Sequence, residues 1–416
     1  MEEIATQDTY KSYMIFFIGQ LFSLLGSLVI FFVIFIWIND VTGSPIMLSI
    51  ANFIFLIPTL VVFPFAGVIS DRYDRKKIIL VTDSLLALIT TILAFFFIFE
   101  FTILWVVFLF LGLRSVCQGF HMPTISAIVP SMIPRDKLSR INGVRFLFLG
   151  IVQFVGPAVG ATLLFFFPIK YILWIDVVTF FIALPPLIKL KAPRIRSEIK
   201  SEGRNSFGRE IKEGLSIIKT IPGLLVIMLL AMLLMLLSQP SMTLAPFFIK
   251  NIHGGNNFTL ALNNMILQGG MIVGSLVVSI KKHWKNKIQI IFMGIMLTNI
   301  GYLVYALAPI GVFLMIQIGL LIMGLIMPII NNIVMTVIQT TVPLDKMGRV
   351  SSTLNLLMMV ATPLGAILAG PLSELLGVAP LYVICALASI GVTIIPYLSK
   401  GIRNIDYDAP IIGSMK

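Results

Sequence analysis

Long apolar runs separated by short polar loops constrain this sequence more than any other feature. Twelve runs of 20 or more residues can be drawn. Each is long enough to cross a hydrocarbon core as a helix, which takes roughly 20 residues at about 1.5 Å per residue. We therefore predict an all-α membrane protein with twelve transmembrane helices. The runs fall near 12–38, 44–70, 78–99, 102–128, 139–167, 169–188, 223–249, 258–280, 288–308, 311–340, 350–376 and 379–399.

The composition agrees with a chain that lies mostly in lipid. Hydrophobic residues make up 58% of the sequence and charged residues only 12%, a balance that excludes a soluble globular domain. The formal net charge of +12 would suggest nucleic acid in a soluble protein. Here the cations fall in the short loops, so orientation and anionic lipid explain them better. Membrane lipid is an expected partner and nucleic acid is not.

The distribution of Lys and Arg predicts the topology. Of the 30 cations, 26 lie in the tails and in the loops on one side of the predicted membrane, whereas the opposite loops hold only Lys170 and Lys250. Because cytoplasmic loops carry the excess of positive charge, both termini should be cytoplasmic, in the plasma (inner) membrane. The first ten residues hold three acids and no base, so no cleavable signal peptide is expected.

The two halves of the sequence look related. Pro134–Arg140 recurs as Pro343–Arg349, with the proline, the Asp-Lys pair and the arginine each 209 residues apart, and Gly156 matches Gly365 in the same register. A six-helix unit used twice is a transporter architecture. We expect two pseudo-symmetric six-helix bundles with the binding site between the halves, near mid-membrane.

A long polar segment divides these halves. Phe207, Ile211, Leu215 and Ile218 follow one another at helical spacing in its second part, which predicts a short amphipathic helix on the inner membrane surface. The expected domains are an N-terminal bundle, a cytoplasmic linker with that helix, a C-terminal bundle and a cytoplasmic tail, over residues 1–190, 191–222, 223–400 and 401–416.

Arg114 is the most informative single residue. It lies about twelve positions into the fourth apolar run, roughly 18 Å deep. An unpaired cation at that depth costs roughly 2.5–3.5 kcal/mol on insertion scales. Arg114 should therefore face a wet cavity, a carboxylate or an anionic ligand. A structural pair with no role in transport remains an alternative.

Polar residues between the second and third runs form a tight turn at the membrane surface. Gly67 would allow two helix backbones to approach closely, and Asp71 could pair with Arg72 or Arg75 or face the N-terminus of a neighbouring helix. The turn could act as a conformational gate. The alternative is an anchor that only sets the orientation in the membrane.

The fifth run contains Gly156, Pro157 and Gly160. The two glycines share a helix face, which permits close packing, and the proline removes a backbone hydrogen bond and bends the helix. A bent, closely packed helix suits the bearing of a rocking motion between two bundles. Ordinary small-residue packing is the alternative.

These patterns resemble the major facilitator superfamily. The resemblance is carried by the turn, with a glycine followed four residues later by Asp71-Arg72 and a basic cluster, although Asp74 stands where the family usually has glycine. Arg114 followed by Gln118-Gly119 resembles the helix 4 motif, with a spacing one residue longer. Gly156-Pro157-x-x-Gly160 resembles the antiporter motif, which in that family accompanies export.

Further short patterns are similar to the macrolide-efflux and enterobactin-exporter branch of the drug:proton antiporters. They are Arg114-Ser115, Phe120-His121-x-Pro123, Thr42-Gly43-Ser44, Gly348-Arg349-Val350 and Phe207-x-x-Glu210-x-x-x-Gly214. The resemblance implies proton-driven export of a hydrophobic or amphipathic molecule, macrolide-like or siderophore-like. An uptake carrier, a lysolipid-flipping carrier of the same fold and a non-transporting receptor are the alternatives.

The resemblance also implies where protons and substrate would bind. Arg114 would belong to the proton-coupling or substrate region. Asp83 and Asp176 could exchange protons, but the third and sixth helices of this fold usually lie at the periphery, so packing or lipid-interface roles are equally expected. His121 reads as a satisfied buried histidine and Arg145 as a cytoplasmic anchor.

Polar contacts to a substrate could come from four amide side chains within the apolar runs. We see no metal-ligand spacing, no nucleotide-binding loop and no catalytic constellation, so a monomeric transporter without cofactor, and not an enzyme, is expected. The candidate cavity residues are Gln20, Gln239, Asn331 and Asn332.

Overall fold

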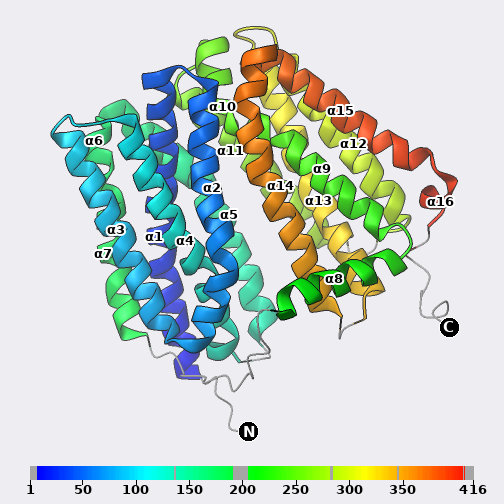
Figure 1. Ribbon diagram of the computed structural model, residues 1–416, viewed down its shortest axis with the longest axis horizontal. Coiled ribbons are helices and arrows are strands. Elements are labelled where there is room, and N and C mark those ends of the chain that lie inside the picture. Colours follow the sequence, from blue (N-terminus) through cyan, green and yellow to red (C-terminus); the bar gives the residue numbers. More distant parts are fainter. Residues whose placement is uncertain are drawn as a thin grey trace. The chain divides into compact units, whose positions relative to one another are not determined.

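A computed structural model gives the fold of residues 7–134, 137–190, 205–281, 284–343, 346–405 and 407 (Figure 1). Among these residues, twelve helices are long and apolar enough to cross a membrane. The predicted fold class is confirmed: the protein is an all-α membrane protein with two six-helix bundles. The bundles follow from the apolar runs, because a helix satisfies all of its backbone hydrogen bonds within one segment of chain.

The chain divides into two compact units. The first is Met1–Ile199 together with Asn256–Leu262, and the second is Lys200–Gly255 with Asn263–Lys416. The domain boundaries expected from the sequence remain a prediction.

Six spans make up the first unit, and one of them is interrupted. Leu173 ends a short helix and begins the next, where the sequence had suggested one continuous run over 169–188. The helices are α1 (Gln7–Thr42), α2 (Pro45–Arg72), α3 (Arg75–Ile98), α4 (Leu104–Met132), α5 (Leu138–Phe166), α6 (Ile169–Ile172) and α7 (Trp174–Lys189).

The second unit also contains an interrupted span. The run expected over 223–249 breaks at Leu244 and continues as a short helix and a π-helical turn, near two prolines that lack a backbone N–H. The helices are α8 (Asn205–Thr220), α9 (Leu224–Thr243), α10 (Ala245–Phe247), η2 (Phe248–Ile252), α11 (Asn257–Ile280), α12 (Lys287–Ala306), α13 (Phe313–Thr341), α14 (Met347–Leu376), α15 (Val378–Leu398) and α16 (Lys400–Arg403).

The internal repeat is visible in the helix bounds. The helices α4 and α13 are both 29 residues long and begin 209 residues apart, and α5 and α14 also begin 209 residues apart. The register found in two short basic loops therefore extends over whole helices of both units.

Each unit has its own apolar core. In the first unit α1 packs against α5 and α7, and α4 packs against α2 and α3. Tyr13 and Ile79 belong to this core, and Phe292 and Ile333 belong to the core of the second unit. These contacts hold the interior faces of α1, α3, α4 and α7 together, which is where the polar clusters lie.

The linker helix α8 belongs to the second unit and crosses one end of it (Figure 1). Gly214 lies against the backbone of Arg349 and the side chain of Thr353 on α14, so α8 and α14 approach closely. Glu213 also pairs with Arg349 at 3.1 Å. The predicted contacts of Phe207 and Ile211 lie outside the described side chains, whereas Ile218 is buried in the core.

Candidate functional site

Arg114 on α4 forms a buried ion pair with Asp176 on α7. Its Nη1 atom lies 2.6 Å from Asp176 Oδ2, and only 5% and 4% of the two residues are exposed. The Thr90 hydroxyl donates to the same carboxylate oxygen at 2.7 Å and also contacts Arg114, while the Ser27 hydroxyl donates to Oδ1 at 3.2 Å. Both oxygens of Asp176 therefore accept hydrogen bonds, and the cation is compensated as the sequence required.

Local structure brings these side chains together. A Cβ added to Gly26 would lie 3.2 Å from the Asp176 Cα, so α1 and α7 approach closely and Ser27 reaches the carboxylate. Asp176 stands in the first turn of α7, after the break at Leu173. The N-terminal end of a helix attracts negative charge, which adds to the effect of Arg114.

Asp83 on α3, His121 on α4 and Gln20 on α1 form a second buried cluster. The Gln20 amide donates from Nε2 to Asp83 Oδ2 at 3.0 Å. His121 Nε2 lies 2.8 Å from Asp83 Oδ1 and 3.1 Å from Gln20 Oε1. It makes no well-aligned hydrogen bond with the carboxylate oxygen. Because an amide oxygen can only accept, these partners assign a hydrogen to Nε2 of His121.

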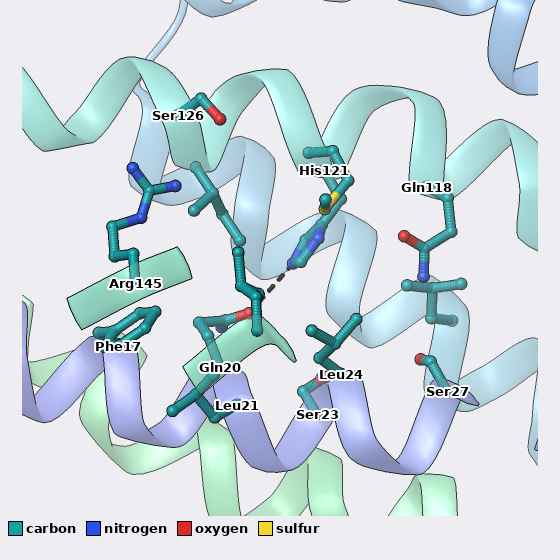
Figure 2. A pocket seen from close by; sticks show the side chains of 14 residues that line it. Phe17, Gln20, Leu21, Ser23, Leu24, Ser27, Gln118, His121, Ser126 and Arg145 are labelled. Carbon is teal, nitrogen blue, oxygen red and sulfur yellow. Dashed lines mark hydrogen bonds between the residues drawn. The ribbon is translucent and has the colours of Figure 1, made fainter. Parts of the chain in front are cut away.

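A small, mostly apolar cavity with several polar side chains in its wall adjoins this second cluster. It has a volume of ≈ 60 Å³, enough for a few water molecules at roughly 10–15 Å³ each. Figure 2 shows Arg145 and Ser126 at one end, Gln118 and Ser27 at the other, and the bonded pair of His121 and Gln20 between them. The lining residues are Phe17, Gln20, Leu21, Ser23, Leu24, Ser27, Leu86, Gln118, His121, Met122, Ile125, Ser126, Arg145 and Leu149.

The structure gives the surroundings of Asp83, Asp176 and Arg145. For the two carboxylates the sequence left proton exchange and packing or lipid-interface roles open; both are buried, each with a polar partner. Arg145 is partly buried and lines the cavity, and its role as an anchor stays a prediction (Figure 2). His121 is buried as expected but only half satisfied, since its Nδ1 has no hydrogen-bond partner among the described residues. In the sequence, Arg114 and His121 are seven residues apart on α4, and Asp83 and Thr90 are seven residues apart on α3. These equal spacings were the signal that the two helices could bring both pairs of polar side chains together.

The predicted gate loop forms hydrogen bonds with the helix ends of the first unit. Arg75 donates from Nη1 to the Ala127 carbonyl at 2.6 Å and from Nε to the Ser70 carbonyl at 3.2 Å. Asp74 caps α3 by accepting from the Lys76 backbone, which explains an aspartate where the family usually has glycine. Cations suit the C-terminal ends of helices, where carbonyls lack partners.

The remaining gate residues behave differently. Within the first unit, no described atom lies within 4 Å of a Cβ added to Gly67, so the expected close approach of two backbones is not seen inside this unit. Asp71 and Arg72 end α2, but their pairing lies outside the described side chains and stays a prediction.

The antiporter-type motif packs on α1. A Cβ at Gly156 would lie 3.0 Å from the Leu28 Cβ, and one at Gly160 would lie 2.8 Å from a ring carbon of Phe32. Pro157 is buried within α5. In the second unit Gly365 meets the Leu236 carbonyl of α9 in the same manner. The close packing predicted for these glycines is therefore present, and its role in motion stays a prediction.

The other candidate polar residues lie in the second unit. Gln239 is buried and packs on Gly365, whereas Asn331 and Asn332 are exposed on α13. Within the described ranges, no group of three or more His, Cys, Asp or Glu residues is arranged to hold a metal ion.

Comparison with known proteins identifies the family. The Major Facilitator Superfamily description matches residues 16–366. The chain belongs to the major facilitator superfamily. Macrolide efflux protein A of Streptococcus pyogenes is 28% identical over 391 residues, covering 93% of this chain and 96% of the relative. The multidrug efflux pump Tap of Mycolicibacterium fortuitum is 23% identical over 375 residues, covering 88% and 90%.

A solved transporter structure has the same fold. The crystal structure of a POT family transporter in complex with 5-aminolevulinic acid superposes with a TM-score of 0.72, at 11% identity, covering 95% of this chain and 97% of the other. As a member of the major facilitator superfamily the chain is a multi-pass membrane transporter and not an enzyme. Its interior nonetheless holds a cluster, Asp83 with His121 and Gln20, that the family motifs in the sequence did not indicate.

Proposed function

We propose that this transporter exports a hydrophobic or amphipathic small molecule, macrolide-like or siderophore-like, in exchange for protons. The observation that carries the proposal is the set of buried ionisable groups in the first unit, which are Asp83, Arg114, His121 and Asp176. His121 and the partly buried Arg145 line a small cavity. Ionisable side chains within a membrane segment are costly and mark ion or substrate pathways. A secondary transporter that moves protons needs such groups.

The relatives support the direction and the cargo class. Macrolide efflux protein A aligns along nearly the whole chain, and a multidrug efflux pump aligns along 88% of it. The efflux activities in these names are those of the relatives. We extend export to this chain because the alignment spans both units and because Gly156 and Gly160 pack closely on α1.

Several parts of the mechanism follow from the same proposal. Residues 1–190 and 223–400 rock against each other to give alternating access, joined by the linker at 191–222. The loop from Gly67 through Asp71, Arg72 and Arg75 gates the cytoplasmic side, and Gly156, Pro157 and Gly160 form the bearing.

The setting belongs to the proposal as well. The transporter works as a monomer in the plasma membrane with both termini, including the tail at 401–416, in the cytoplasm. The excess of Lys and Arg in the loops on one side supports that orientation.

Everted membrane vesicles test the function. With a macrolide as probe, we expect an inward-acidic proton gradient to drive accumulation inside vesicles that contain the protein, and not inside matched vesicles that lack it. Collapse of the gradient should abolish the accumulation. Uptake carriers would move the probe in the opposite direction, and a receptor would bind it without transport. A susceptibility screen over chemically varied toxic compounds, with and without the protein, would then define the cargo.

A further inference from the structure

Two buried clusters in the first unit contain a carboxylate beside a nitrogen base, and their chemistry differs. In the first, Asp176 is bonded on both oxygens and faces Arg114, whose guanidinium stays protonated in proteins. Protonating Asp176 would leave a buried, uncompensated cation, which is strongly unfavourable. This pair is a fixed ion pair and is poorly suited to binding and releasing a proton.

The second cluster has room for one more proton. His121 is the side-chain type whose charge changes near neutral pH. Its Nε2 faces Asp83 and Gln20, while its Nδ1 is buried and has no hydrogen-bond partner among the described residues. A proton that arrives at Nδ1 breaks no existing hydrogen bond. His121 also lines the cavity, so the proton source in the step below is cavity water, which must first reach the buried Nδ1.

Few charged side chains lie close to His121, and the three cations of α3, Arg75 to Lys77, stand in its first turn, about two turns from Asp83. From α5, Arg145 lines the same cavity. From α4 and α7, Arg114 and Asp176 compensate each other about two helical turns away. The helices α1 and α2 carry no Asp, Glu, Lys or Arg between Lys11 and Asp71 apart from Asp40 at the far end of α1. Asp83 is therefore the charge that faces His121 most closely, at 2.8 Å.

We propose that Asp83 and His121 form the proton-binding site of this transporter, with Gln20 as the positioning residue that links the site to α1. On uptake, an N–H bond forms at His121 Nδ1 with a proton from cavity water, and the Asp83 carboxylate becomes half of a neutral ion pair. On release, that N–H bond breaks, the proton returns to water, and Asp83 remains as a buried anion held by Gln20.

Gln20 couples the proton to helix packing. The Gln20 side chain forms a hydrogen bond with Asp83 through Nε2 and another with His121 through Oε1, so it contacts both partners at once. When His121 loses its proton, Asp83 no longer has a cationic partner. The hydrogen bond from Gln20 then provides a larger share of the stabilisation of the Asp83 carboxylate. The α1 helix, which carries Gln20, also packs on Gly156 and Gly160 of α5. A shift of Gln20 would therefore move the surface on which α5, the helix proposed as the bearing, packs.

This inference rests on the proposed function, and two readouts keep the two apart. The first is a 15N chemical-shift titration of the full chain in lipid nanodiscs between pH 5 and 9, with His253 and His283 replaced by Gln so that only His121 reports. We expect one protonation at Nδ1. In D83N, proton affinity should fall by roughly 10-fold or more, because a nearby negative charge favours the charged histidine. A His121 signal that stays neutral throughout, or that ignores D83N, overturns the proposal.

The second readout is transport of a labelled macrolide in proteoliposomes. D83N and H121Q should lose at least 10-fold in gradient-driven accumulation while keeping exchange of probe without a gradient, and Q20A should lose less. H253Q is the matched control, because His253 is also buried, with its pKa lowered by burial, but lies in the second unit outside the spans. Gradient-driven transport that survives in both D83N and H121Q overturns the site. Absence of gradient dependence in the parent overturns the proposed function instead.

Discussion

The two units share helix register but differ in their interiors. Among the described residues, buried Asp and Arg side chains occur only in the first unit. In the 209-residue register, Arg114 corresponds to Met323 and Asp176 to Cys385, both buried in the second unit. Since the same bundle forms with a thioether and a thiol at these positions, the fold does not require the charges.

An aromatic cluster fills the corresponding interior of the second unit. Tyr305 and Tyr382 stack with ring centroids 5.7 Å apart, and Phe248 lies 4.8 Å from Tyr382. Such rings bury large apolar area and pack in fixed geometry. One unit therefore has an interior that holds paired charges and the other has an interior of packed aromatic rings, so an exchange of residues between them tests what the charges contribute.

The largest effect is expected from that exchange. R114M leaves Asp176 as an uncompensated buried anion and should cost roughly 3–5 kcal/mol in the free energy of unfolding, measured by SDS titration. The double variant R114M/D176C, which installs the pair of the second unit, should recover more than half of that loss because no lone charge remains. M323L is the control, expected to cost under about 1.5 kcal/mol. Equal stability of R114M and M323L would contradict a buried ion pair.

The next largest effect is expected from Gly156 and Gly365, the glycines that recur in the two units. A Cβ at Gly365 would lie 2.6 Å from the Leu236 carbonyl oxygen, whereas one at Gly156 would lie 3.0 Å from a side-chain atom of Leu28. Backbone cannot move aside as readily as a side chain. G365A should therefore cost roughly 1–3 kcal/mol of unfolding free energy, and G156A less.

Thermal unfolding of the two glycine variants in the same detergent provides the measurement. Gly391 on α15 has open space around its Cβ direction, which makes G391A the matched control. A larger loss in G156A than in G365A would show that the α1–α5 packing is tighter than these contacts indicate.

A smaller effect is expected at the hydrogen bonds that hold the helix ends of each unit together. In the first unit Lys76 donates to the Ile188 carbonyl at 2.6 Å. In the second unit the Tyr407 hydroxyl donates to the Pro222 carbonyl at 2.6 Å, and Lys287 donates to the Tyr407 carbonyl. Y407F should cost roughly 0.5–1.5 kcal/mol at neutral pH, the usual net value of one hydrogen bond.

The same residue predicts a pH dependence. Burial raises the pKa of Tyr407 to about 12, from an ordinary value of 10.0. The folded state thus holds the proton more tightly, so the stabilisation is complete below pH 10 and is lost as the pH rises toward about 12. The melting temperature of the parent should approach that of Y407F over this range. A constant difference between them would rule out a buried, neutral Tyr407.

The smallest effect is expected inside the aromatic cluster. The Tyr382 hydroxyl is buried near Tyr305 but makes no well-formed hydrogen bond. Y382F removes a polar group whose burial is not compensated, so unfolding free energy should change by less than about 1 kcal/mol. A loss as large as that of R114M would mean that the second interior depends on specific polar contacts after all.

Much of the fold was predictable from hydrophobic length alone, because only helices of about 20 residues bury their backbone in lipid. The repeat of Pro134–Arg140 at Pro343–Arg349 predicted the paired bundles, and the depth of Arg114 predicted a partner. The breaks at Leu173 and Leu244 were missed, since apolar residues continue through them without interruption.

The sequence by itself determined twelve spans, a duplicated bundle, and a cation in the interior that had to be compensated, because an unpaired charge deep in lipid is costly. Tertiary packing alone decided which carboxylate pairs with Arg114, and which is left beside His121. That choice depends on the close approach of α1 and α7 at Gly26 and on the register of α3 against α4, distances that no spacing within one helix contains.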